Sequence, residues 1–171
     1  MDAKQIEEVR QKVKVPPNMQ PALEKIEMAG KKVMYSKETH QLVMQAIQGP
    51  GPLDARLGKA IADLMAILYQ QSNKTMPPQL ILPAAVLLFC DALLFLMQAN
   101  QIDDQFDVGA ALETAVTMTL QKFGIKPDQV QPMIEKFTKG GMINSAGVAN
   151  AAGPAPGMAP QQPAPQQPQG V

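Results

Sequence analysis

The chain has 171 residues, enough for one domain, and its 15 basic and 15 acidic residues give a formal net charge of zero. A balanced chain without a strongly basic stripe is not suited to a phosphate backbone, so we expect no nucleic-acid partner. The charged N-terminus lacks the apolar stretch of a signal peptide, and a single cysteine excludes an intramolecular disulfide.

Apolar residues recur at helical rather than alternating spacing, so the sequence predicts an all-α fold. A first helix covers about residues 3–14, and the pair Pro16–Pro17 ends it. Asn18 is the expected N-cap of a second helix, with Pro21 inside its first turn.

Ser36 is the expected N-cap of a third helix over about residues 36–48. A Gly-Pro-Gly-Pro turn at 49–52 separates it from a fourth helix over about 53–72. Apolar residues in that fourth segment repeat every three or four positions, which is typical of an amphipathic helix. Two prolines at 77–78 are expected to close the segment.

Residues 80–97 form an apolar run in which Asp91 is the only polar residue. A membrane-spanning helix needs about 20 apolar residues, so the run lies near the lower limit. Pro83 suits the first turn of a helix that begins near residue 82, which would leave the helix too short to span. Asp91 would also cost about 2.5–3.5 kcal/mol at the bilayer centre. We therefore expect a central core helix, with membrane insertion as the alternative.

In a core helix the Asp91 carboxylate needs a partner or a place at the edge, because an unpaired buried charge is costly. Arg56, Lys59 and His40 are candidate partners, and the sequence does not choose among them. Cys90, inside the same run, is expected to behave as a small buried hydrophobic residue rather than as a reactive thiol.

A sixth helix is predicted over about residues 105–123, with Gly124 just past its end. The acidic residues Asp103, Asp104 and Asp107 at its start match the spacing that holds magnesium in prenyl-diphosphate synthases. Those enzymes use a second acidic motif that this chain lacks. Carboxylates at the start of a helix are explained more simply by capping and by the helix dipole.

A short seventh helix is predicted from about residue 126, and glycines at 140–141 end it. The last 32 residues contain no charge and are rich in Pro, Gln, Gly and Ala, so they cannot bury enough apolar surface to fold. We therefore expect a compact bundle of about six or seven helices over residues 1–139 and a disordered, low-complexity tail over 140–171.

The sequence provides no recognisable catalytic, cofactor-binding or metal-binding constellation. His40 is the only histidine and Cys90 the only cysteine, too few for a zinc site or a catalytic triad. Phosphate-binding loops and nucleophile elbows are also lacking. We therefore expect a protein that is not an enzyme and uses no cofactor, and a magnesium enzyme built on the acidic cluster ranks last.

Two stretches carry a resemblance to a known group of proteins. The first is MQPALEK at 19–25 with AGKKVMYSKETH at 29–40, and the second is LYQQSNKTMPP at 68–78, running into LPA at 82–84. Together they resemble small virion-associated structural proteins of tailed bacteriophages, over roughly residues 19–125. The resemblance implies a helical protein with a structural role in the particle or its assembly, and it carries over no functional residues.

The expected function is therefore that of a structural virion component, present in the virion and, during assembly, in the host cytoplasm. It would bind other virion proteins through amphipathic helix faces, and homo-oligomerisation is left open. One alternative is an ejected or holin-like protein that inserts helix 80–97 into the host membrane. Another is an assembly chaperone or scaffold that is missing from finished particles.

Overall fold

The computed structural model describes residues 3–36, 44, 48–102 and 106–125. These residues form five α-helices and no β-strand, which confirms the predicted all-α class. Most of the third helix expected at 36–48, the seventh expected from residue 126 and the tail expected at 140–171 lie outside the described residues, so the count of six or seven helices is not matched. The described helices are α1 (Ala3–Lys12), α2 (Gln20–Tyr35), α4 (Leu53–Gln71), α5 (Pro78–Gln98) and α6 (Val108–Lys122).

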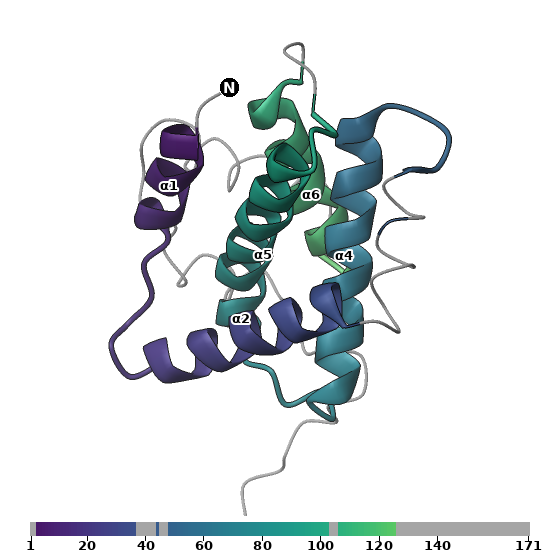
Figure 1. The fold of residues 1–171 in the computed structure, drawn as a ribbon. Coiled ribbons are helices and arrows are strands. Elements are labelled where there is room, and N and C mark those ends of the chain that lie inside the picture. The colour runs from purple at the N-terminus through teal and green to yellow at the C-terminus, as the bar shows by residue number, and fades with distance from the viewer. Residues whose placement is uncertain (1–2, 37–43, 45–47, 103–105, 126–171) are drawn as a thin grey trace, which may run out of the picture.

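Helix α5 lies at the centre of the described fold, and each of the other four helices contacts it (Figure 1). In this view α1 and α4 lie on opposite sides of α5, and α2 runs across the lower part of the picture. Because neighbours surround it, α5 is apolar on nearly every face, and Asp91 is its only charged residue. This arrangement confirms that the apolar run forms a core helix.

The start of α5 differs from the sequence-based expectation. The helix begins at Pro78, where a missing N–H costs nothing because the first N–H groups of a helix have no intrahelical partner. Pro83 consequently lies inside the helix, where it removes one backbone hydrogen bond. The expectation that Pro83 stands in the first turn, and that the helix is too short to span, was therefore wrong.

With 21 residues, α5 is long and apolar enough to cross a membrane by length and composition alone. Its most apolar stretch has a mean hydropathy of 2.5, but 83% of that stretch is buried by the rest of the protein. It is the one such helix among the residues that the structure describes. Burial of this extent is what a core helix of a globular protein requires.

Helices α4 and α6 pack closely along their lengths. Gly58 permits the approach: a Cβ atom there would lie 2.8 Å from Thr114 Cγ2, too close for any real side chain. Further along, the rings of Tyr69 and Phe123 meet edge to face, with centroids 5.2 Å apart. The apolar stripe predicted for the fourth helix faces this core, and its buried members are Leu57, Ile61, Leu64, Met65 and Leu68.

A similar glycine lies where α2 crosses α5. A Cβ atom on Gly30 would lie 2.4 Å from Leu88 Cδ2, and Leu88 is fully buried in the core. The absence of a side chain at residue 30 therefore lets the backbone of α2 approach Leu88 of α5 closely. Next to Gly30 on α2, the Lys31 side chain lies 3.4 Å from Asp91 Oδ2 of α5.

The structure confirms some of the predicted helix caps and corrects others. Met19, not Asn18, is the N-cap of α2 and makes no side-chain capping bond, while Ser36 is the C-cap of α2. Asp107 caps α6 as expected, its Oδ1 accepting from Ala110 N at 3.1 Å. Gly124 follows α6 with φ of +80°, the left-handed conformation that such a position favours.

Candidate functional site

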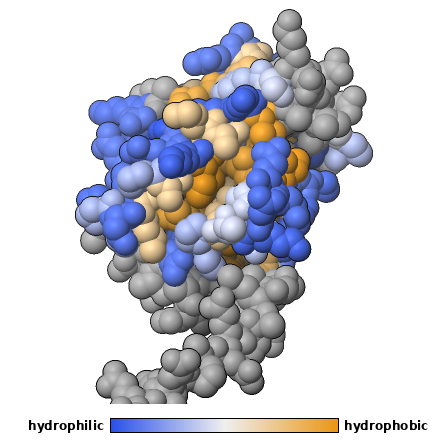
Figure 2. Space-filling view, turned by 90° about the horizontal axis from the view of Figure 1, so that it is seen from below, coloured by the Kyte–Doolittle hydropathy of each residue, from blue (hydrophilic) through white to orange (hydrophobic). Residues whose placement is uncertain are grey.

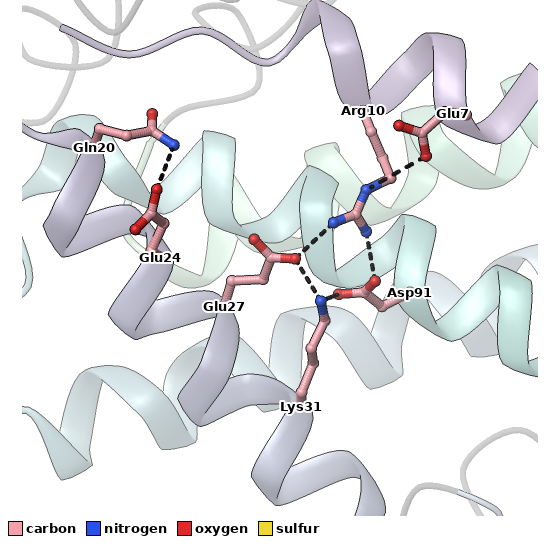
Figure 3. A network of polar contacts seen from close by, with 7 residues as sticks. All are labelled: Glu7, Arg10, Gln20, Glu24, Glu27, Lys31 and Asp91. Carbon is pink, nitrogen blue, oxygen red and sulfur yellow. Dashed lines mark hydrogen bonds and ion pairs between the residues drawn. The ribbon is translucent and has the colours of Figure 1, made fainter. Parts of the chain in front are cut away.

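The most distinctive feature of the described residues is a cluster of four charged side chains between α1, α2 and α5 (Figure 3). At its centre is the Asp91 carboxylate of α5, whose side chain is only 8% exposed. Arg10 of α1 donates from Nη1 to Asp91 Oδ1 at 2.5 Å and from Nη2 to Glu27 Oε1 at 2.7 Å. One guanidinium therefore joins a carboxylate on α5 to a carboxylate on α2.

Lys31 of α2 closes the cluster into a ring. Its Nζ donates to Glu27 Oε1 at 2.7 Å and lies 3.4 Å from Asp91 Oδ2. Glu27 and Lys31 stand one helical turn apart, the spacing at which helix side chains meet. Two acids and two bases alternate around this ring, which we call the ion ring: Arg10, Glu27, Lys31 and Asp91. Glu7 adds a longer ion pair to Arg10, at 3.9 Å.

Burial and charge act in opposite directions on the carboxylates of the ring. Burial raises the pKa of Asp91 above its ordinary value, against the opposing effect of Arg10 and Lys31. Burial acts in the same direction on Glu27, but hydrogen bonds from Lys31 and Arg10 outweigh it and lower the pKa of Glu27.

The two bases of the ring respond in the complementary way. Burial favours their neutral forms, yet the carboxylates of Glu27 and Asp91 outweigh that effect, so the pKa values of Arg10 and Lys31 are raised. The formal charges of the ring, from two carboxylates and two bases, balance one another. Such a balance lets four ionised groups occupy a largely buried place between helices.

The partners suggested by the sequence for Asp91 were wrong where the structure describes them. Among the described residues, Asp91 pairs with Arg10 and Lys31, and not with Arg56 or Lys59. Lys59 instead donates to Asp63 at 2.7 Å on its own helix. His40, the third candidate, lies outside the described residues.

Asp63 joins a second, more exposed group of charges. Its carboxylate accepts from Lys59 of α4 and from Lys122 of α6, and so ties those two helices together at the surface. Burial acts to raise the pKa of Asp63, but hydrogen bonds from Lys122 and Lys59 outweigh it, so its pKa is lowered.

Cys90 stands next to Asp91 and is 1% exposed. Burial raises the pKa of its thiol to about 12, and the charge of Arg10 only partly opposes this. At neutral pH the side chain is therefore a thiol and not the nucleophilic thiolate. The expected burial of Cys90 is confirmed, and the raised pKa favours an unreactive thiol in the folded protein.

The acidic segment before α6 is described only in part. Asp107 acts as a helix cap, whereas Asp103 and Asp104 lie outside the described residues. In the part of the chain that the structure describes, no group of three or more His, Cys, Asp or Glu side chains is arranged to hold a metal ion. The ion ring does not provide such a group either, because two of its four members are cations.

Comparisons of the chain with protein-family models, with curated proteins and with solved structures give no match. The function must therefore be argued from the residues themselves. The ion ring can hold α1, α2 and α5 together, because each of its charged groups points at another charged group of the ring (Figure 3).

Proposed function

We propose that this protein is a non-enzymatic structural component of a tailed-phage virion that binds other particle proteins through its helix faces. The main supporting observation is that the four members of the ion ring pair with one another and join helices. That arrangement supports a role in which the buried charges hold helices together. The resemblance over residues 19–125 supports the particle as its setting, with the host cytoplasm as the place of assembly.

The surface offers apolar side chains for such binding. Among the described residues, three large apolar side chains are exposed: Met28 on α2 by 70%, Tyr35 at the end of α2 by 50% and Ile67 on α4 by 42%. Figure 2 shows apolar residues in the middle of one face, with hydrophilic residues around them. Flexible methionine side chains adapt to partners of different shape, so Met28 is the residue on which we centre the proposed contact.

Peptide mass spectrometry of density-gradient-purified particles tests the proposal. Recovery of these peptides at a constant ratio to the major particle proteins would support it. Recovery from infected-cell lysate, with none in finished particles, would refute it in favour of an assembly chaperone or scaffold. Met28→Glu should lower incorporation, because it places a charge on an exposed apolar contact. Gln121→Glu adds the same charge at an exposed position on α6 and is the matched control.

The length and hydropathy of α5 favour a second candidate, insertion into the host membrane. Such a protein would have to move α5 out from among four helices, and Asp91 would be the one charge that enters the bilayer. Flotation of the purified protein with liposomes tests this. Binding that increases in Asp91→Leu would support insertion, and a protein that stays with the soluble fraction in both forms would refute it.

A further inference from the structure

Helix α1 is attached to the rest of the protein by a small contact. It has ten residues, and the one described helix against which it packs substantially is α5. Among residues 4–12 of this helix, Ile6 alone is fully buried; Val9 packs partly against the core, and Arg10 enters the ion ring. A helix this short is marginal in water without such contacts. Loss of Ile6 and Arg10 from their places would therefore release α1 as a unit.

The surface that α1 covers is defined by four residues, which we call the α1 seat: Glu27, Lys31, Cys90 and Asp91. Cys90 belongs to it because it is buried on α5 directly beside Asp91, the residue that Arg10 of α1 contacts. Release of α1 would thus uncover the only cysteine of the chain.

The α1 seat recognises α1 by charge as well as by shape. Without α1 it has two carboxylates and one ammonium group, so it lacks one positive charge. Arg10 supplies that charge, and Ile6 stands one helical turn before it on the same face of α1. None of these contacts depends on which copy of the chain provides the helix.

The connection between α1 and α2 suits exchange. Residues 13–19 include Pro16 and Pro17, whose rings fix φ and so limit the conformations that the connection can adopt. The backbone hydrogen bonds described for the segment are local, such as Val13 N to Arg10 O and Met19 N to Pro16 O. Fully extended, seven residues reach roughly 23–25 Å, far enough to leave the protein surface.

We propose that α1 is an exchangeable arm that docks in the α1 seat of a second copy of this chain. This inference rests on the proposed function, because copies inside a particle are held at high local concentration and exchange between them is a low-cost route to association. Each exchanged arm would place Ile6 and Arg10 of one copy against Cys90 and Asp91 of another.

The first test uses Cys90 as a reporter. In Ile6→Asp the arm cannot stay seated, so Cys90 should react with a thiol reagent at least about tenfold faster than in the wild type. A synthetic peptide of residues 1–15 should restore protection, and the same peptide with Ile6→Asp should not. Equal reaction rates in variant and wild type, or a peptide that restores nothing, would overturn the proposal.

The second test asks whether another copy provides the arm. Isotope-labelled Ile6→Asp chain mixed with wild type should form mixed dimers in native mass spectrometry, with Cys90 of the labelled chain protected. Pro16→Gly with Pro17→Gly should reduce wild-type dimers, because a flexible connection lets each arm return to its own seat. If the peptide restores protection of Cys90 but no dimer forms, the α1 seat does not bind the arm of a second copy, and the proposal is overturned.

Circular dichroism of Ile6→Asp confirms that the rest of the chain stays helical. If it does not, the milder Ile6→Ala replaces it in both tests, with a smaller expected increase in thiol reactivity. Mass spectrometry of purified particles tests the proposed function independently of these two tests. If the arm does not exchange, this proposal fails, and the proposed virion role is still tested by the particle measurement.

Discussion

Replacement of Arg10 by methionine is the sharpest test of the ion ring. Methionine keeps much of the apolar stem of arginine but has no charge and no donor. The change removes the hydrogen bond of 2.5 Å to Asp91 and that of 2.7 Å to Glu27, and it leaves the Asp91 carboxylate largely buried. The helices themselves are untouched, so the result measures what the ring contributes.

The expected loss of stability depends on how deeply the ion pair is buried and on which interactions of Asp91 and Glu27 remain in the variant. Removing one partner of a buried ion pair costs about 3–5 kcal/mol. Two features lower that figure here: the Arg10 side chain is 20% exposed, and Lys31 stays 3.4 Å from Asp91 and in hydrogen-bond contact with Glu27. We therefore expect Arg10→Met to lower the free energy of unfolding by about 2–3 kcal/mol.

Urea unfolding followed by far-ultraviolet circular dichroism measures this loss. Lys59→Met is the matched control, because it breaks an ion pair of 2.7 Å with Asp63 in which the lysine side chain is 70% exposed. Exposed pairs contribute at most about 1 kcal/mol, so the control should change stability little. A double-mutant cycle of Arg10→Met with Asp91→Asn should give a coupling energy of about 1–3 kcal/mol.

Two results would refute the reasoning. If Arg10→Met costs no more than Lys59→Met, the ring does not hold α1 and α2 against α5. If the single variants are costly but their coupling is near zero, Arg10 acts through packing of its stem and not through Asp91. In either case the ring would be an incidental product of helix packing.

Three further changes test the packing, the cap and the electrostatics. Gly30→Ala should cost about 1–3 kcal/mol in urea unfolding, because the new Cβ would lie 2.4 Å from a side-chain carbon of the buried Leu88. Asp107→Ala should cost about 1 kcal/mol in the same assay, through loss of the cap on α6. The pKa of Glu27 lies below its ordinary value of 4.5, so its contribution is complete above that pH and is lost as the pH falls through the folded-state pKa. Glu27→Gln should therefore flatten the fall of the unfolding temperature in acid, while Glu24→Gln, which alters only an exposed contact within α2, should leave it as in the wild type.

Local patterns in the sequence predicted the helices well where one signal dominated. The stripe of apolar residues in α4 and the residues Asp107 and Gly124 at the ends of α6 act through contacts within a few positions, so their roles can be read from spacing. The start of α5 had two competing signals, prolines at 77–78 and at 83. Proline at either place fits the first turn of a helix. The helix begins at the earlier pair, and the additional turn that this creates packs against the core.

The ion ring could not be predicted from the sequence for a different reason. Asp91 and Arg10 are 81 positions apart, and a buried carboxylate attracts any cation that the fold brings near. Which cations arrive depends on where α1 and α2 pack against α5, and Gly30 is one residue that permits the close approach of α2. A glycine inside a helix shows that something approaches closely, but it does not say what.

The ring also explains why a helix as apolar as α5 keeps one charge. On a helix that is apolar on nearly every face, only the fit of side-chain shapes opposes rotation among its neighbours, which leaves some freedom. Asp91 removes that freedom: its carboxylate must face Arg10 and Lys31, since any other orientation would leave it buried without a partner. The same carboxylate raises the cost of placing α5 in a bilayer. One side chain thus sets the rotation of the central helix and favours its place inside the protein over a place in a membrane.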